Sequence, residues 1–188
     1  KTDLGRMFGF AYGHKENGAV FSHMAIMYAN ALYKRGFVEE GFKVIDSLYS
    51  HCNKFEISRI YPGVPEYINS RGRGMYHYLT GSASWLILTV LTEMFGVKGD
   101  MGDLKLEPKL LLKQFDENYK AAINMTFAER RFHIEYINEA SKEFNEYSIK
   151  EIYLDNNKYN SENYSVIYKK DIILLDEGKT HNIKVILE

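Results

Sequence analysis

Cysteine is nearly absent from this chain of 188 residues, which contains Cys52 alone. One cysteine cannot form an internal disulfide, and this usage is typical of a reducing compartment, so we expect a cytoplasmic protein. Cys52 itself is expected to be a small buried apolar residue rather than a nucleophile. Metal-binding clusters are also missing, because His14 and His23 have no Cys, Asp or Glu at ligand spacing. We therefore expect no metal site and no bound cofactor.

An excess of one charge and a long hydrophobic run are missing as well. The formal net charge is -1, which gives no electrostatic case for binding nucleic acid or an anionic membrane. No apolar run reaches the roughly 20 residues of a membrane span. The chain starts KTDLG, with neither an initiator Met nor the apolar region of a signal peptide, and from this we expect a fragment of a longer protein. The hydrophobic content of 45% and charged content of 26% are typical of a globular protein.

Common catalytic motifs are absent too. No Gly-x-Ser-x-Gly elbow and no phosphate loop of the Walker type occur. Glycosidic-bond chemistry usually needs two carboxyl groups on opposite faces of the sugar. Glu16 and Glu66 lie in the predicted loops that are richest in other polar residues, but no pair of carboxylates is singled out by the sequence.

The first half of the chain has the periodicity of helices. Apolar residues recur at spacings of three and four over residues 21–32, and Gly36 is expected to end that helix. Residues 39–51 predict a second helix, and the short connection implies an antiparallel hairpin. Residues 53–74 contain two prolines and predict a long loop, for which a functional role is a reasonable expectation. Residues 82–95 predict a third helix that is apolar nearly all round and therefore buried on most sides.

The second half has the alternation of strands. Short alternating runs separated by turn residues predict an antiparallel β-sandwich or open sheet. The runs are 104–106, 121–127, 131–138, 147–149, 165–168, 171–175 and 182–187, with turns at 155–158 and 177–178. The chain is thus expected to be α+β, with a helical part over residues 1–99 and a linker and strand part over residues 100–188.

Two predicted helix starts could bind an anion. Thr80 or Ser82 is a suitable N-cap for the third helix, and a hydroxyl, Gly81 and the helix N-terminus together offer several donors at the positive end of a helix dipole. His23 lies near the first turn of the first helix, where an imidazole could also meet an anion. The alternatives are a capped helix without a ligand, and a histidine that bonds a backbone carbonyl.

Four segments, in this order, resemble one family. They are residues 17–23 (NGAVFSH), 61–67 (YPGVPEY), 79–85 (LTGSASW) and 106–108 (LEP). They are similar to the C-terminal part of glycoside hydrolase family 94, the inverting β-glucoside phosphorylases that include cellobiose, cellodextrin, chitobiose and 1,2-β-oligoglucan phosphorylases. Residues 72–78 (GRGMYHY) look most like the 1,2-β-oligoglucan branch. The resemblance covers roughly residues 1–138.

The resemblance implies a fold and a set of roles. The first part would be the last helices of an (α/α)6 barrel, and the rest a small antiparallel β-sandwich. His23, Thr80 and Gly81 would bind inorganic phosphate, which attacks the anomeric carbon of a β-glucan and yields a sugar 1-phosphate. Glu16, Glu66 and Arg73 would lie near the sugar or the phosphate, together with Arg71, His14 and Lys15. The family places its general-acid Asp upstream of these segments, so this chain alone is expected to be inactive.

Two other functions remain open from the sequence. One is a stand-alone carbohydrate-binding module, which needs exposed Trp or Tyr on a sheet face, whereas Trp85 is on a predicted helix. The other is a structural domain without catalysis. The helices of a partial barrel would expose apolar faces, which favours a homodimer.

Overall fold

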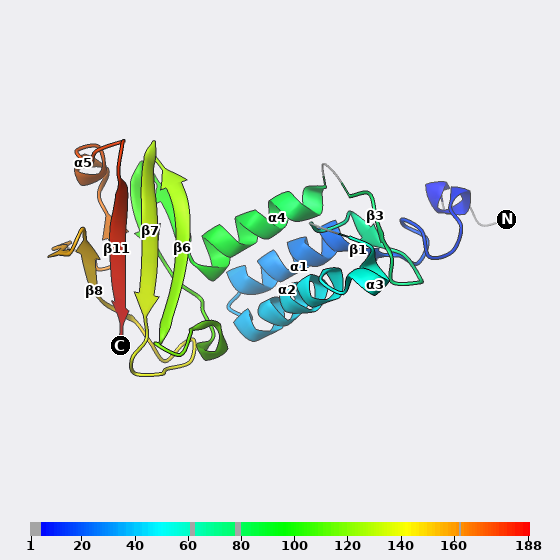
Figure 1. The fold of residues 1–188 in the computed structure, drawn as a ribbon, viewed down its shortest axis with the longest axis horizontal. Helices are drawn as coiled ribbons and strands as arrows, with labels where there is room; N and C mark the ends of the chain where they lie inside the picture. Colours follow the sequence, from blue (N-terminus) through cyan, green and yellow to red (C-terminus); the bar gives the residue numbers. More distant parts are fainter. Residues whose placement is uncertain (1–4, 61–62, 78–79, 162) are drawn as a thin grey trace. The chain divides into compact units, whose positions relative to one another are not determined.

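The computed structural model describes residues 5–60, 63–77, 80–161 and 163–188. Two compact units divide the chain, Lys1–Val90 and Leu91–Glu188. The first is mainly helical and the second is rich in strands (Figure 1), so the predicted α+β class is confirmed. The origin of the helices in an (α/α)6 barrel, and a domain boundary at residues 99–100, stay predictions. Residues 61, 62, 78 and 79 of the family-like segments lie outside the described residues.

The first unit is built around a helical hairpin. After a 3-10 helix, η1 (Gly5–Gly9), come α1 (Ser22–Lys34), α2 (Val38–Cys52) and the short α3 (Phe55–Ser58). The predicted hairpin of α1 and α2 is confirmed, and Gly36 between them has a φ of +84°, as expected of a residue that ends a helix. The side chain of Cys52 is buried in the core between these helices, as predicted, and burial raises the pKa of its thiol.

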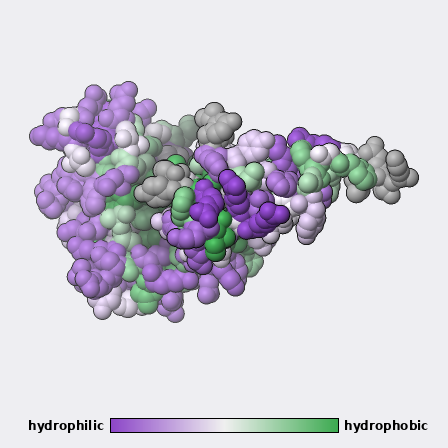
Figure 2. Space-filling model, turned by 45° about the vertical axis from the view of Figure 1, so that its right-hand side comes forward, coloured by the Kyte–Doolittle hydropathy of each residue, from purple (hydrophilic) through white to green (hydrophobic). Residues whose placement is uncertain are grey.

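The third predicted helix differs from expectation. It starts at Gly81 as α4 (Gly81–Thr89) and continues as a π-helical turn, η2 (Val90–Met94). One face packs on α1, where the Asn30 side chain donates to Thr89 Oγ1 at 3.1 Å. The prediction that this helix is buried on most sides is wrong, because the side chains of Ile87 and Leu88 are 61% and 44% exposed. Hydrophobic residues reach the surface among hydrophilic ones in Figure 2. The homodimer expected from such faces stays a prediction.

Three very short strands precede the start of α4. β1 (Val20–Phe21), β2 (Tyr67–Ile68) and β3 (Gly74–Met75) form a small antiparallel sheet, in which Phe21 is paired with Tyr67. Their sequences are too short to show alternation, so the predicted loop over residues 53–74 contained no strand signal. Because β1 runs directly into α1, its pairing with β2 places the long loop beside the N-terminus of that helix.

The second unit contains two sheets. One has the order β6, β7, β11, β8, β9 and the other β10, β5, β4. Side chains alternate along the long strands, and the buried set includes Phe132, Ile134 and Tyr136 on β7. Tyr136 donates its hydroxyl hydrogen to the carbonyl of Phe95 at 2.6 Å, and burial raises its pKa. The strands are β4 (Val97–Asp100), β5 (Asp103–Leu106), β6 (Lys120–Phe127), β7 (Arg130–Ile137), β8 (Ile149–Leu154), β9 (Asn157–Lys158), β10 (Val166–Ile167) and β11 (Thr180–Leu187).

Two predictions for this unit are wrong. The larger sheet is mixed rather than antiparallel, because β11 is parallel to β7 with Ile183 beside Ile134. Parallel neighbours need a long connection, because the chain must return to the end of the sheet where the first strand began. The connection from β7 to β11 is of this kind and includes β8, β9 and β10. Residues 171–175 are not a strand: α5 (Lys169–Ile172) begins before them, and Leu174 is 82% exposed. Their continuous apolar run has no alternation, and such a run does not distinguish helix from strand. The turn at residues 155–158 is confirmed, since Asp155 and Asn156 both have positive φ between β8 and β9.

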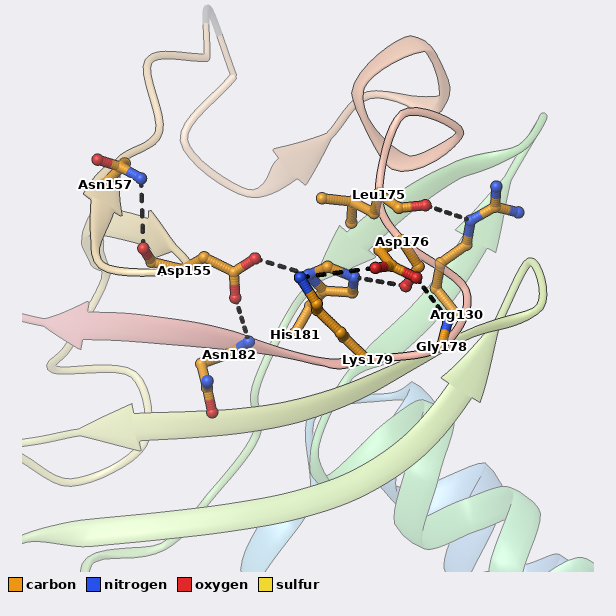
Figure 3. A network of polar contacts seen from close by, with 9 residues as sticks. All are labelled: Arg130, Asp155, Asn157, Leu175, Asp176, Gly178, Lys179, His181 and Asn182. Carbon is orange, nitrogen blue, oxygen red and sulfur yellow. Dashed lines mark hydrogen bonds and ion pairs between the residues drawn. The ribbon is translucent and has the colours of Figure 1, made fainter.

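A buried histidine links the start of β11 to the β8–β9 turn. Figure 3 shows His181 between Asp155 and Asp176. Its Nδ1 lies 2.6 Å from Asp155 Oδ2, and its Nε2 lies 2.9 Å from the Asp176 carbonyl oxygen. Both neighbours can only accept, so both ring nitrogens donate only when the imidazole is protonated. Burial lowers the pKa of His181, but these two hydrogen bonds outweigh it and the net pKa is raised above 6.5.

We expect the second unit to lose stability as the pH rises above the unfolded-state pKa of His181, 6.5, and through its raised folded-state pKa. Because the folded-state pKa of His181 is raised, its protonated ring stabilises the folded unit fully at pH values below the unfolded-state pKa of 6.5. This stabilisation is lost as the pH rises through the folded-state pKa. For Asp155, burial raises the pKa but the bonds from His181 and the Asn182 N–H lower it below 3.8, so its contribution is lost only in acid. Urea unfolding at several pH values, for the wild type and His181→Gln, measures the effect.

The matched control is His133→Gln, which alters a partly exposed histidine on β7 that bonds Asn124. The pH slope should flatten in His181→Gln and persist in His133→Gln. An unchanged slope in His181→Gln would contradict the assignment.

Candidate functional site

Two of the predicted phosphate-binding residues are in contact. His23 is in the first turn of α1, and Gly81 is the first residue of α4. A Cβ placed on Gly81 would lie 2.7 Å from Cε1 and 2.8 Å from Nδ1 of His23. The imidazole therefore lies directly against the glycine backbone, in a space that a side chain at this position would fill.

The N-termini of both helices are fixed to one stretch of the loop, residues 64–66, which we call the connecting segment. Thr80 donates its hydroxyl hydrogen to the first carbonyl of this segment at 3.0 Å, and Ser82 donates to the second at 2.8 Å. The third carbonyl accepts the backbone N–H of Ser22 at 2.9 Å. Three successive carbonyls thus hold the first turns of α1 and α4 together, so the long loop has a structural role.

Thr80 is the N-cap of α4, which decides between the two predicted candidates, Thr80 and Ser82. Its Oγ1 accepts from the Ala83 N–H at 3.2 Å, and its hydrogen is used by the connecting segment. In this arrangement the Thr80 hydroxyl has no hydrogen to offer an anion. The donors of α4 are instead backbone N–H groups at Gly81 and Ser82, because the first N–H groups of a helix have no partner within it.

Two buried polar atoms at the start of α1 lack partners within the described residues, Ser22 Oγ and His23 Nε2. Ser22 is fully buried. A buried polar atom without a hydrogen bond costs about 1–3 kcal/mol, so each such atom requires an explanation. The Trp85 ring lies 6.3 Å from the His23 ring, centroid to centroid, and adds an apolar neighbour. A ligand oxygen beside His23 would satisfy the unpaired nitrogen.

The three predicted sugar-binding residues have different surroundings. Glu16 pairs with Arg6 at 3.5 Å. Glu66 belongs to the connecting segment and adjoins Ser22 through its backbone. Arg73 borders a separate cavity. A role for any of them in binding sugar stays a prediction.

The cavity that contains Arg73 is one that sequence reasoning did not find. It has a volume of about 850 Å³. Arg59 borders this cavity with a backbone φ of +55°, and no sequence pattern indicates that angle. The polar and charged residues around it are His14, Arg59, Asn69, Ser70, Arg71 and Arg73.

No group of three or more His, Cys, Asp or Glu suited to a metal occurs in the part of the chain that the structure describes. Among the same residues, no helix is both long enough and apolar enough to cross a membrane.

Comparison with known proteins gives one distant likeness. No family model matches the chain. The chain is similar to the cellobionic acid phosphorylase of Neurospora crassa, with 24% identity over 122 residues. The match covers 58% of this chain and 15% of that protein, so the chain spans only a small part of its relative. The likeness is to a phosphorylase and agrees in kind with the resemblance drawn from the short segments.

Proposed function

We propose that this chain supplies the phosphate-binding part of a glycoside phosphorylase. The observation that carries the proposal is the contact between His23 and Gly81, at the point where two helix N-termini are held together. Phosphate at pH 7 is an anion with several acceptor oxygens, and helix N-termini with free N–H groups are a common way to bind it. The unpaired His23 Nε2 adds a side-chain group at the same place.

Each residue would have a defined role. The backbone N–H groups of Gly81 and Ser82 would donate to phosphate oxygens, and His23 would donate from Nε2. Thr80 would position α4 as its cap rather than bind phosphate directly, because its hydrogen is given to the connecting segment. Gly81 has no side chain, which allows both the imidazole and a ligand to approach its backbone.

The reaction class rests on the resemblance and on the relative's name. In an inverting phosphorylase of family 94, phosphate attacks the anomeric carbon of a β-glucoside and a general acid protonates the leaving oxygen. The acid is expected on a residue outside this chain, and the glucan linkage is left open. The 188-residue chain should therefore bind phosphate and release no glucose 1-phosphate from a β-glucan.

Titration of the isotopically labelled chain with inorganic phosphate tests the proposal. Amide signals of Gly81 and Ser82 and the ring signals of His23 should shift together. His23→Ala should weaken binding roughly 10-fold or more, because a hydrogen bond to a charged group contributes about 1.5–3 kcal/mol.

The control is His133→Ala, which removes a histidine from the second unit and should leave phosphate binding unchanged. Binding that is equally strong in the wild type and His23→Ala would reject this site and favour a structural role for the unit. Release of glucose 1-phosphate by the chain alone would show that the acid lies within it.

A further inference from the structure

We propose that the cavity bordered by Arg59, Arg71 and Arg73, here called the arginine cavity, binds the anionic group of a sugar-sized ligand, either a carboxylate or a phosphate ester. Its volume of about 850 Å³ is in the range of small-molecule sites. The lining is formed by three separate stretches of the first unit: residues 11–14, the end of α3, and the turn between β2 and β3.

The turn between β2 and β3 holds two of the arginines in place. The Asn69 side-chain oxygen accepts the backbone N–H groups of both Arg71 and Arg73 at 3.0 Å, and the Asn69 N–H donates to the Arg73 carbonyl at 2.9 Å. His51 Nε2 donates to the Gly72 carbonyl at 2.7 Å and fastens the tip of the turn to α2. The backbone that carries both arginines is therefore defined before any ligand binds, which lowers the entropic cost of binding.

The facing wall is packed closely on this turn. Gly13 lies against Ser70 so closely that a Cβ on Gly13 would overlap the serine side chain. The Ser70 N–H also donates to the Gly13 carbonyl at 3.3 Å. His14, the next residue, borders the cavity, and its Nδ1 lies 3.4 Å from the Tyr67 hydroxyl. Glycine at position 13 is thus required for the wall to approach the arginine-bearing turn.

Arg59 reaches the cavity from a strained backbone position. It is the C-cap of α3 with φ of +55° and ψ of +28°, in the left-handed region that glycine and asparagine favour. This conformation ends α3, because the Arg59 N–H donates to the Phe55 carbonyl at 2.9 Å. Arg59 lines the cavity, and its guanidinium lies over the Phe55 ring at 5.7 Å from the centroid.

The cavity has an excess of positive charge among the residues that the structure describes. No carboxylate is among the described residues that line it. Within the described residues, none of the three arginines makes an ion pair. Guanidinium groups match carboxylate and phosphate oxygens with paired hydrogen bonds. The side chains of Asn69 and Ser70 offer hydrogen bonds that suit the hydroxyls of a sugar.

This inference does not depend on phosphate binding by His23, because neither His23 nor Gly81 lines the arginine cavity. Arg71 and Arg73 were expected near the sugar or the phosphate on the strength of the resemblance alone. The cavity adds Arg59 to them and specifies an anionic ligand. The two proposals can therefore fail separately.

The test is calorimetric titration of the full 188-residue chain at low salt with gluconate, glucose 6-phosphate and glucose. We expect gluconate or glucose 6-phosphate to bind and glucose not to, and the stronger of the two identifies the anion. Arg71→Gln/Arg73→Gln should weaken binding roughly 10-fold or more, since each charge-assisted hydrogen bond contributes about 1.5–3 kcal/mol. Binding should also weaken as salt is added.

Two variants serve as controls. Arg35→Gln removes one exposed positive charge at the end of α1 and should have no effect. His23→Ala should leave gluconate binding intact while it weakens phosphate binding. Equal binding of glucose and gluconate, an equal loss in Arg35→Gln, or an unchanged affinity in the double variant would each overturn the proposal.

Discussion

Gly96→Ala should destabilise the second unit by about 3 kcal/mol or more. Gly96 lies between η2 and β4 with a φ of +65°, and a Cβ there would overlap the Glu107 carbonyl group and come within 2.7 Å of the Pro108 nitrogen. These are backbone atoms, so they cannot move aside as a side chain could. They are also tied in place, because the Glu107 N–H donates to the Gly96 carbonyl at 2.8 Å.

Gly36→Ala is the matched control for this substitution. Gly36 has a φ of +84°, so alanine suffers a similar backbone strain, but nothing lies within 4 Å of the added Cβ. It should cost only about 1 kcal/mol. Urea unfolding of both variants, with hydrogen exchange of the amides in β7 and β11, distinguishes the cost of backbone strain at positive φ from the cost of the steric overlap. A Gly96→Ala protein no less stable than Gly36→Ala would refute the clash.

Local signals in the sequence predicted the local structure well. The helix that became α1 was visible in spacings of three and four, and Gly36 marked its end. Thr80 was recognised as a cap because a hydroxyl before an apolar helix has few other roles. The turn at residues 155–158 was recognised because Asp and Asn tolerate positive φ. In each case the information lies within a few residues of the element that it specifies.

Features that depend on distant parts of the chain were not predictable in this way. The parallel pairing of β11 with β7 depends on the path of the long connection between them, and nothing in either strand indicates direction. The connecting segment bonds through backbone carbonyls, which every residue possesses, so its sequence did not indicate which groups it binds, although residues 64–66 belong to one of the family-like segments. Arg59 joins the arginine cavity through a backbone angle that arginine rarely adopts.

The candidate phosphate site combines both kinds of information. His23 and Gly81 were identified by their likeness to a family, and local chemistry only permitted the assignment. Their contact, and the use of the Thr80 hydrogen by the connecting segment, come from the tertiary structure. On this basis we propose that Thr80 positions α4 and that the backbone of α4 donates to the phosphate.

Gly81→Ala should abolish most phosphate binding while it leaves the fold intact. The added Cβ would lie 2.7 Å from His23 Cε1 and 3.1 Å from Nε2, so the imidazole must rotate away from the start of α4. A side chain can move where a backbone cannot, and alanine is a better helix residue than glycine. The free energy of unfolding should therefore stay within about 1 kcal/mol of the wild type. Phosphate affinity should fall roughly 10-fold or more as the His23 hydrogen bond is lost.

A double-mutant cycle shows whether the loss acts through His23. In a His23→Ala background the ring is already absent, so Gly81→Ala should weaken phosphate binding little further, and the two effects should not add. Gly9→Ala is the control, because its Cβ would have nothing within 4 Å. Additive losses would mean that Gly81→Ala weakens binding independently of the His23 ring, which would contradict this explanation. Phosphate titration of the four proteins, each checked for folding by circular dichroism, measures the coupling.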